Sequence, residues 1–177
     1  MSSSRPPTAN DDLTAMIAGR ARTNSGVETE SVTDLAWPCL LVRVGDRWCG
    51  LRAEDVSDVV APEAVTRVPS QPKHVLGVSL VHGRLVPVID IGPLMPDMEA
   101  SLESRFGRRM AVVTHGDTEI GILADDAKGV IELPVPEHDP AAAAGRPAFI
   151  RGEVRWRDQL VCLLDVVALI HASIGLG

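Results

Sequence analysis

Apolar and polar residues between Val75 and Ile89 alternate with the two-residue period of β-strands. One face carries Val75, Gly77 and Ser79, and the other carries Leu76, Val78 and Leu80. Gly83 then supplies the residue type that a tight hairpin turn needs, and Leu85–Ile89 follows as a second strand. Because this second strand is apolar at every position, we expect it to be buried on both faces, with Pro87 marking an edge or a bulge.

The same pattern occurs twice along the chain. Residues 45–60 align with residues 116–131, and residues 77–90 align with residues 152–165, with glycines and apolar positions in register. A sheet of a few short strands is too small to be stable alone. We therefore expect each half to close into a small β-barrel and to pack against the other half, in an all-β dominated fold.

The expected organisation is a tail followed by one domain of two subdomains. Residues 1–36 are rich in Ser, Thr, Asn, Asp and Pro and lack the apolar density that ordering requires, so they predict a disordered N-terminal tail. The domain is expected over 37–177, with subdomain 1 at about 37–98 and subdomain 2 at about 107–174. The polar segment Met95–Arg109 is the expected junction.

Asn10–Arg22 could form a short helix within the tail. Asn10 is a suitable cap, and one helical face carries Leu13, Met16 and Ile17. Two interpretations stay open: a transient helix without a role, and a helix that docks on a partner.

Two aspartates stand at the same position of the repeat. Asp165 precedes a segment with helical spacing that ends near Ser173, and Asp90 precedes a shorter turn in the first half. A catalytic carboxylate pair is one interpretation of Asp90 and Asp165. Because both recur at the end of a strand and before a helical turn, we favour capping of the turns by their carboxylates.

Composition excludes several classes of partner. The net charge is −7 and the pI is about 5.2, so no general positive field attracts a phosphate backbone. Aromatic residues make up 3% of the chain, without any tyrosine, which leaves few platforms for base stacking. We expect no nucleic-acid partner.

Cysteine usage and hydropathy favour a cytoplasmic protein. Cys39, Cys49 and Cys162 contain no C-x-x-C pair and form an odd set, so we expect three reduced and mostly buried thiols. The first residues lack the apolar region of a secretory signal, and no run approaches the ~18 apolar residues that span a bilayer. Any membrane association is expected to come through a partner.

Motifs of catalysis are missing from the sequence. It contains no phosphate-binding glycine loop, dinucleotide fingerprint, nucleophile elbow or H-E-x-x-H. The five histidines are spaced unlike structural zinc ligands. We expect no cofactor and no metal site, and an enzyme that uses Asp90, Asp165 or His82 as acid-base groups is the disfavoured alternative.

The order of prolines, glycines and apolar residues in Thr66–Asp90 resembles the core motif of the CheW family. The segment reads T-R-V-P-S-Q-P-K-H-V-L-G-V-S-L-V-H-G-R-L-V-P-V-I-D, against the family's T-x-V-P-x-x-P-x-x-V-x-G-V-x-N-L-R-G-x-V-V-P-V-I-D. Val56–Val60 resembles the family's V-x-E-V/I, and Gly121–Asp125 resembles its G-[IL]-V-V-D. The resemblance extends over Leu40–Ile170. It implies a fold of two packed SH3-like five-stranded β-barrels with a shared core, short helices and a C-terminal helix.

The resemblance also implies a function without catalysis. Members of this family couple chemoreceptors, the methyl-accepting chemotaxis proteins, to a CheA-type histidine kinase in chemotaxis or a related chemosensory pathway. The expected partners are the kinase's regulatory domain and the receptor's cytoplasmic tip, at receptor arrays that recruit the protein from the cytoplasm. The alternative is a CheW-like interaction module that organises a different complex, such as a pilus or polar-localisation system.

Positions that bind partners in the family carry over by motif. The receptor-binding positions are Val56, Gly77, Val78, Leu80, Val81 and His82, and the kinase-binding positions are Asp58 and Val59. Strand alternation requires that Val78 or Val81 faces a barrel core. Val56 and Val59 are the stronger candidates, because Ser57 and Asp58 between them indicate an exposed turn.

One departure from the family motif concerns the turn. The family's N-L-R-G is here Leu80-Val81-His82-Gly83, so a leucine replaces the asparagine and a histidine replaces the arginine. Histidine is shorter than arginine and lacks its fixed charged fork. Either the receptor surface served by this protein differs, or receptor binding is weaker and the protein is an accessory adaptor.

Overall fold

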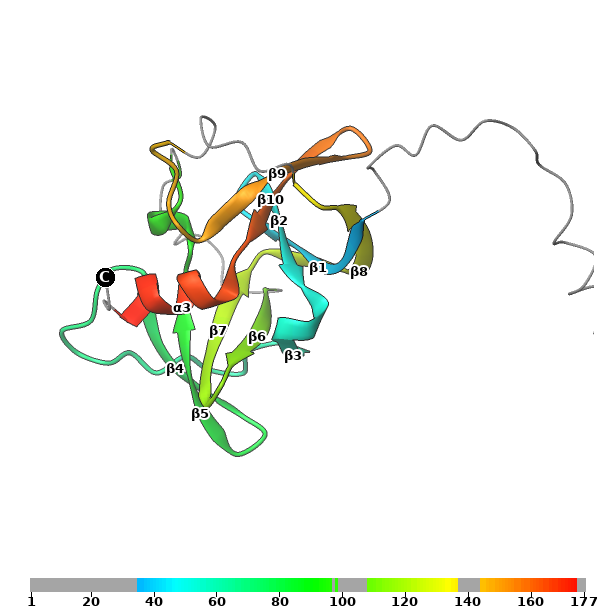
Figure 1. Cartoon of the computed structure of the whole chain (residues 1–177). Helices are drawn as coiled ribbons and strands as arrows, with labels where there is room; N and C mark the ends of the chain where they lie inside the picture. The colour runs from blue at the N-terminus through cyan, green and yellow to red at the C-terminus, as the bar shows by residue number, and fades with distance from the viewer. Residues whose placement is uncertain (1–34, 97, 99–107, 137–143, 175–177) are drawn as a thin grey trace, which may run out of the picture. The chain divides into compact units, whose positions relative to one another are not determined.

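The computed structural model describes residues 35–96, 98, 108–136 and 144–174 (Figure 1). The predicted tail, up to residue 34, and its possible helix Asn10–Arg22 lie outside the described residues. The strands are β1 (Ala36–Val44), β2 (Arg47–Arg52), β3 (Val56–Val60), β4 (Val75–Val81), β5 (Arg84–Ile89), β6 (Arg109–His115), β7 (Thr118–Ala124), β8 (Asp126–Pro134), β9 (Ile150–Trp156) and β10 (Gln159–Leu164). The 3-10 turns are η1 (Ala53–Asp55) and η2 (Gly92–Leu94), and the C-terminal helix is α3 (Val166–Ile174).

The strands form two five-stranded sheets that pack against each other as two small barrels. The first sheet has the order β8-β1-β2-β10-β9 and the second has the order β3-β6-β7-β5-β4. In Figure 1 the first sheet occupies the upper part of the domain and the second the lower part. Neighbouring strands are antiparallel except in the pairs β2–β10 and β5–β7. The predicted fold class is confirmed.

The prediction that each half of the chain closes into its own barrel is wrong. The first sheet takes β1 and β2 from the first half and β8 to β10 from the second, and the second sheet takes β3 to β5 and then β6 and β7. Each barrel therefore contains two strands of one repeat and three of the other, in the same spatial order. Subdomains at about 37–98 and about 107–174 do not correspond to the sheets. Four strand pairs join one half to the other: the antiparallel pairs β1–β8 and β3–β6 and the parallel pairs β2–β10 and β5–β7.

Alternation along the strands divides the apolar residues among three cores. On β1, Leu41 faces the interior of the first barrel, while Leu40 and Val42 face a core shared by both sheets. On β6, Val112 faces the interior of the second barrel and Ala111 faces the shared core. The two-residue period of a strand thus supplies both kinds of core. A shared core between the barrels, as the resemblance implied, is confirmed.

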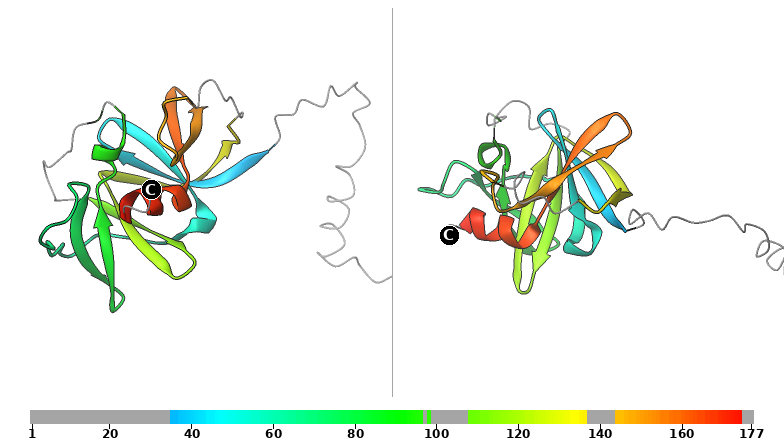
Figure 2. Two further views of the ribbon diagram at one scale, coloured as in Figure 1. Left: turned by 60° about the vertical axis from the view of Figure 1, so that its left-hand side comes forward. Right: turned by 45° about the horizontal axis from the view of Figure 1, so that its top comes forward.

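The C-terminal helix completes the shared core. Val166, Leu169 and Ile170 of α3 are buried in it. In both views of Figure 2 the helix lies against strands of the second sheet. Its start is set by Asp165, whose Oδ1 accepts a hydrogen bond from the Ala168 N–H at 3.0 Å.

Asp90 performs the corresponding task in the first half. Its Oδ1 accepts a hydrogen bond from the Gly92 N–H at 2.9 Å, at the start of η2. Burial raises the pKa of this carboxyl above its usual range, and the hydrogen bond from Gly92 opposes the rise. The capping interpretation is confirmed for Asp165, whereas the N-cap of η2 is Ile91 and Asp90 holds the turn from the preceding position.

The three cysteines are buried and form no disulfide. Burial raises the pKa of Cys39 to about 11 and that of Cys162 to about 11, and it also raises the pKa of Cys49. Cys49 and Cys162 are partners in the parallel β2–β10 pairing. Thiols held protonated in this way behave as small apolar side chains, as expected.

Two buried serines differ in their hydrogen bonding and yield a test of the packing. Ser79 Oγ, inside the second barrel, has no hydrogen-bond partner among the described residues, whereas Ser173 Oγ donates to the Leu169 carbonyl at 2.7 Å. We expect Ser79→Ala to leave the free energy of unfolding unchanged or to raise it by up to about 1 kcal/mol, because an unsatisfied hydroxyl is removed. Ser173→Ala, the control, is expected to lower it by about 1 kcal/mol. Urea unfolding measures both, and an equal loss in the two variants contradicts the assignment.

Candidate functional site

The predicted binding residues lie on β3 and on the β4–β5 hairpin, at the two open edges of the second sheet. Within that sheet β3 pairs with β6, and β4 pairs with β5. Figure 1 shows the hairpin at the lower end of the domain, with β3 on the same sheet. Edge strands leave backbone groups open on one side, so this is where a barrel can accept a partner.

A tight turn fixes the tip of the hairpin. His82 and Gly83 both have positive φ, +47° and +80°, which is the backbone pattern of a two-residue type I′ turn. Glycine adopts this conformation without strain, whereas a histidine adopts it less readily. The turn leaves the imidazole of His82 at the surface, with 67% of the side chain exposed.

His82 joins the hairpin tip to β3. Its Nε2 lies 2.5 Å from Oδ2 of Asp58, although 24 residues separate the two in sequence. The other oxygen of Asp58 accepts a hydrogen bond from the Val59 N–H at 2.7 Å. The hydrogen bond with His82, followed by that from Val59, lowers the pKa of the Asp58 carboxyl below its usual range. A predicted receptor-binding residue and a predicted kinase-binding residue are therefore in direct contact.

Exposure divides the remaining predicted residues. Leu80 is 63% exposed and Val59 is 40% exposed, so both present apolar side chains to solvent. Val56 and Val78 are half-buried, and Val56 packs against the shared core. The segment around Val59 is a strand with a bulge between Val56 and Asp58, and the predicted exposed turn is wrong.

Gly77 and Val81 are buried, so they cannot offer side chains to a receptor. Val81 is 4% exposed and packs inside the second barrel. A Cβ on Gly77, which has φ of +143°, would lie 2.1 Å from the Thr66 carbonyl oxygen. Thr66 and Val78 exchange backbone hydrogen bonds of 2.8 and 2.9 Å at this point. The absence of a side chain at Gly77 thus allows the segment at Thr66 to pair with the edge of β4. Gly77 itself offers no side chain to a partner.

The sequence analysis missed one exposed residue of the hairpin. Leu85 is 71% exposed and is the cross-strand partner of Leu80, so the two leucines are neighbours on the outer face. The expectation that β5 is buried on both faces is wrong, because Leu85 and Pro87 face outward while Val86 and Val88 face the barrel. Leu85 could have been identified from the sequence if alternate positions of the strand had been assigned to an inner and an outer face.

Pro87 does not mark an edge strand, because β5 lies between β7 and β4. The ladder between β5 and β7 involves Val88 and Ile89 and so begins one residue after the proline. The missing N–H therefore falls outside that ladder.

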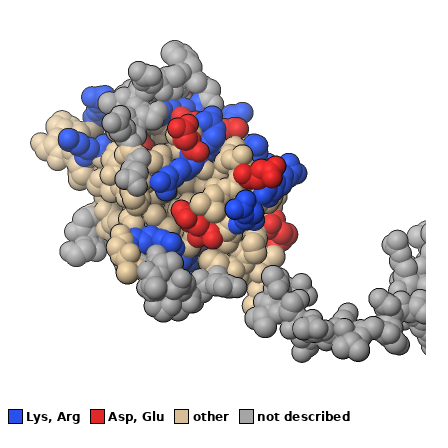
Figure 3. Space-filling view, turned by 90° about the horizontal axis from the view of Figure 1, so that it is seen from above, with Lys and Arg blue, Asp and Glu red and all other residues tan. Residues whose placement is uncertain are grey.

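Charged groups near the hairpin are paired. Arg84 Nη1 donates to Glu119 Oε1 at 2.7 Å and so joins β5 to β7. Leu85 is thus next in sequence to an arginine that is paired with an acidic side chain. Basic and acidic side chains also lie next to one another on the upper side of the domain, away from the hairpin (Figure 3).

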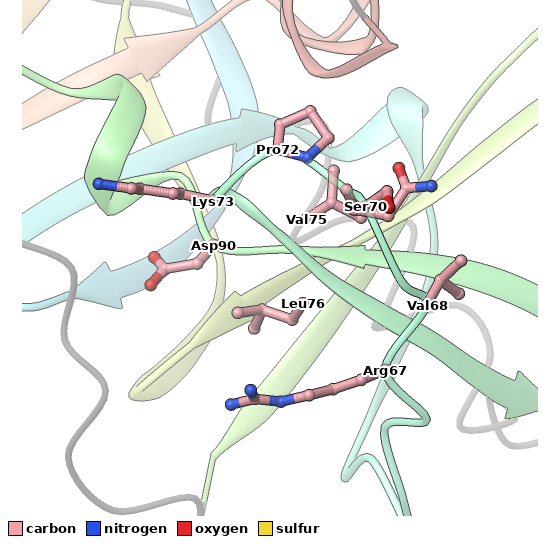
Figure 4. A pocket seen from close by; sticks show the side chains of 9 residues that line it. Arg67, Val68, Ser70, Pro72, Lys73, Val75, Leu76 and Asp90 are labelled. Atoms are coloured by element: carbon pink, nitrogen blue, oxygen red, sulfur yellow. The ribbon is translucent and has the colours of Figure 1, made fainter.

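A hollow of about 340 Å³ lies beside the base of β4 (Figure 4). Its lining mixes charged and apolar side chains: Arg67, Val68, Ser70, Gln71, Pro72, Lys73, Val75, Leu76 and Asp90. In Figure 4 the ends of Lys73 and Asp90 lie on one side and Val68 on the other. The lining contains no histidine or cysteine.

Among the described residues no group of three or more His, Cys, Asp or Glu side chains is placed to hold a metal ion. Within the same part of the chain, none of the helices has the length and apolar character needed to cross a membrane.

Comparison with known proteins agrees with this geometry. The family model described as the CheW-like domain matches residues 38–173. Protein PilI of Pseudomonas aeruginosa is 28% identical over 134 residues, which cover 74% of either chain, and protein FrzA of Myxococcus xanthus is 30% identical over 106 residues, which cover 60% of this chain and 65% of FrzA. The crystal structure of the scaffolding protein TtCheW from Thermoanaerobacter tengcongensis superposes with a TM-score of 0.63 at 21% identity, over 74% of this chain and 90% of that one. The strand exchange, the motif and the extent of these matches lead to one conclusion: the chain belongs to the CheW-like domain family.

Proposed function

We propose that the protein is a non-enzymatic adaptor that couples chemoreceptors to a CheA-type histidine kinase. The proposal rests on one observation: apolar side chains are exposed at positions of the CheW-family motif. These positions lie on the edge strands of the second sheet. Val59 on β3 and Leu80 on the hairpin are both exposed, and a hydrogen bond between Asp58 and His82 links their strands. Exposed apolar residues at adjacent positions are typical of protein-binding surfaces.

The kinase side of the proposed site is β3. Asp58 and Val59 lie on this edge strand, and the hydrogen bond from the Val59 N–H to Asp58 fixes the backbone between them. A partner domain that packs on this edge can bury Val59 without first breaking a backbone ladder. We assign Asp58 and Val59 to the regulatory domain of the kinase.

The receptor side consists of the exposed or half-buried residues Val56, Val78, Leu80 and His82. The buried residues Gly77 and Val81 support it from below. Small apolar surfaces of this kind give modest affinity per contact, which arrays of many copies increase through multivalency. The proposed place of action is the cytoplasmic face of receptor arrays, which the protein reaches through its partners.

The relatives carry different names, PilI, FrzA and chemotaxis protein CheW of Helicobacter pylori, so we retain a second candidate of the same class. In that case the chain organises a complex other than a flagellar chemoreceptor array, such as a pilus or polar-localisation system, without receptor coupling. Binding to the regulatory domain of a CheA-type kinase from the same cell discriminates between the candidates, because the second does not require it.

The exposed valine of β3 gives the decisive variant. We expect Val59→Asp to weaken binding to the kinase regulatory domain by at least about 100-fold, because a charge would replace a side chain that the interface desolvates. The fold is expected to persist, since Val59 is 40% exposed. Isothermal titration calorimetry measures the affinity, and circular dichroism measures the fold.

Val130 provides a matched control for this variant. It occupies the corresponding position of the repeat on β8, in the other barrel, and is 60% exposed. Val130→Asp adds the same charge to the protein, and we expect it to leave kinase binding within about threefold of the original affinity. Equal losses in the two variants would contradict the assignment of the kinase surface to β3.

A further inference from the structure

The link between the hairpin tip and β3 is a short chain of hydrogen bonds. It runs from the His82 imidazole to the Asp58 carboxylate and from that carboxylate to the backbone N–H of Val59. The other side of β3 is held by its ladder to β6, whose register shifts at the bulge between Val56 and Asp58. This edge strand has five residues, and Ser57 Oγ also donates a hydrogen bond to the Val112 carbonyl of β6 at 3.2 Å. The carboxylate of Asp58 adds the contacts with His82 and with the Val59 N–H.

The residue types in this link differ in how they respond to pH. Histidine is the side-chain type whose charge changes between about pH 5 and pH 8. Asp58 stays ionised throughout that range, because its pKa lies below the usual value for an aspartate. Protonation of the imidazole therefore turns a hydrogen bond between a neutral ring and a carboxylate into an ion pair in which both partners are charged, and this contact is stronger.

Few other charges act on the link. Arg84 on β5 is close enough to contribute to the lowered pKa of Asp58. That arginine is engaged by Glu119 on β7 at 2.7 Å. Among the residue types of this cluster, histidine is the one whose charge ordinarily changes in the neutral range.

We propose that His82 is a positioning residue for the β3 docking surface, and that its protonation strengthens the link to Asp58 and holds Val59 in place for the partner. Binding at this surface consequently weakens as the pH rises through the range in which imidazole loses its proton. The inference rests on the proposed function for the identity of the partner. Its structural part, the response of β3 to the state of His82, does not depend on any partner.

The first test follows β3 without a partner. In ¹⁵N-labelled protein, the amide signal of Val59 is recorded by NMR from about pH 5 to about pH 8, the range in which histidine titrates. We expect the signal to move along a sigmoidal curve, because the acceptor of this N–H is the carboxylate that His82 contacts. His82→Asn is neutral at every pH and tolerates the left-handed turn conformation, so its Val59 signal is expected to stay constant. A wild-type signal that is as constant as that of His82→Asn overturns the proposal.

The second test measures affinity for the kinase regulatory domain at pH 6 and pH 8. We expect the wild type to bind about threefold to tenfold more weakly at pH 8, the size expected for one exposed charge-assisted contact. His82→Arg keeps its positive charge at both values and is expected to bind equally at both. If the wild type binds equally at pH 6 and pH 8 while its Val59 signal moves with pH, the proposed control of kinase binding by His82 is overturned.

The two inferences fail in different ways. Absence of kinase binding at both pH values, with a Val59 signal that titrates and becomes constant in His82→Asn, refutes the proposed function and supports the positioning of β3 by His82. Binding that is pH-dependent in the wild type and equally so in His82→Arg overturns the role of His82, because some other group then carries the dependence.

Discussion

Replacement of Gly77 by alanine is expected to lower the free energy of unfolding by at least about 3 kcal/mol, through both steric overlap and backbone strain. A Cβ at this position would lie 2.1 Å from the Thr66 carbonyl oxygen and 2.7 Å from the carbon of the same group. These are backbone atoms, so relief requires that the segment before β4 moves away and that its two hydrogen bonds to Val78 break. The φ of +143° adds strain for any residue with a side chain. Urea unfolding followed by circular dichroism measures the loss.

Gly83 is the matched control within the same hairpin. It also has a positive φ, +80°, but a Cβ there would have no atom within 4 Å. Gly83→Ala is therefore expected to cost about 1 kcal/mol, the strain of a left-handed conformation alone. If the two variants lose the same stability, the contact with Thr66 is not what requires glycine at position 77.

The two halves of the chain are expected to be unfolded when they are produced separately and to fold when they are mixed. A first half ending near residue 98 supplies two strands of one barrel and three of the other, and a second half beginning near residue 108 supplies the complement. Each half alone exposes open sheet edges and the faces that form the shared core. NMR spectra of the single halves should show the narrow amide dispersion of unfolded chains, and the equimolar mixture should show the spectrum of the whole domain.

A chain cut between the halves after folding is the control for this experiment. A protease site inserted among residues 99–107 allows the intact domain to be cleaved without removal of either half. We expect the cleaved protein to keep its spectrum at low denaturant, since the shared core remains assembled. A half that folds alone contradicts the exchange of strands between the barrels.

The local pattern of the sequence predicted most elements of the fold. Alternation identified β4 and β5, the helical spacing after Asp165 identified α3, and the repeat related the hairpins that turn at Gly45 and Gly116. The cap at Asp165, and the hydrogen bond of the Asp90 carboxylate to the start of η2, followed from their equivalent positions. These features depend on neighbours within a few residues, so they can be recognised without knowledge of the partner strands.

The candidate site was predicted in outline, and its arrangement came from contacts between distant segments. The motif identified β3 and the β4–β5 hairpin, but it did not separate the exposed Leu80 from the buried Val81 by itself, and it did not identify Leu85. The contact of His82 with Asp58 links residues on opposite edges of one sheet. Nothing in the spacing of the two residues indicates that contact, because the barrel's curvature brings the edges together.

The sequence by itself determined the β4–β5 hairpin with its turn and the C-terminal helix, because these follow from side-chain periodicity and from residue types that fix the backbone. Only the tertiary structure decided which strands share a sheet. Both halves carry the same apolar pattern, so a pairing within a half and a pairing across the halves satisfy the alternation equally well. The exchanged arrangement places Leu51 of the first half and Leu164 of the second in one shared core, and it joins the halves through two parallel strand pairs. The burial of that core is a property of the whole domain, and no local segment encodes it.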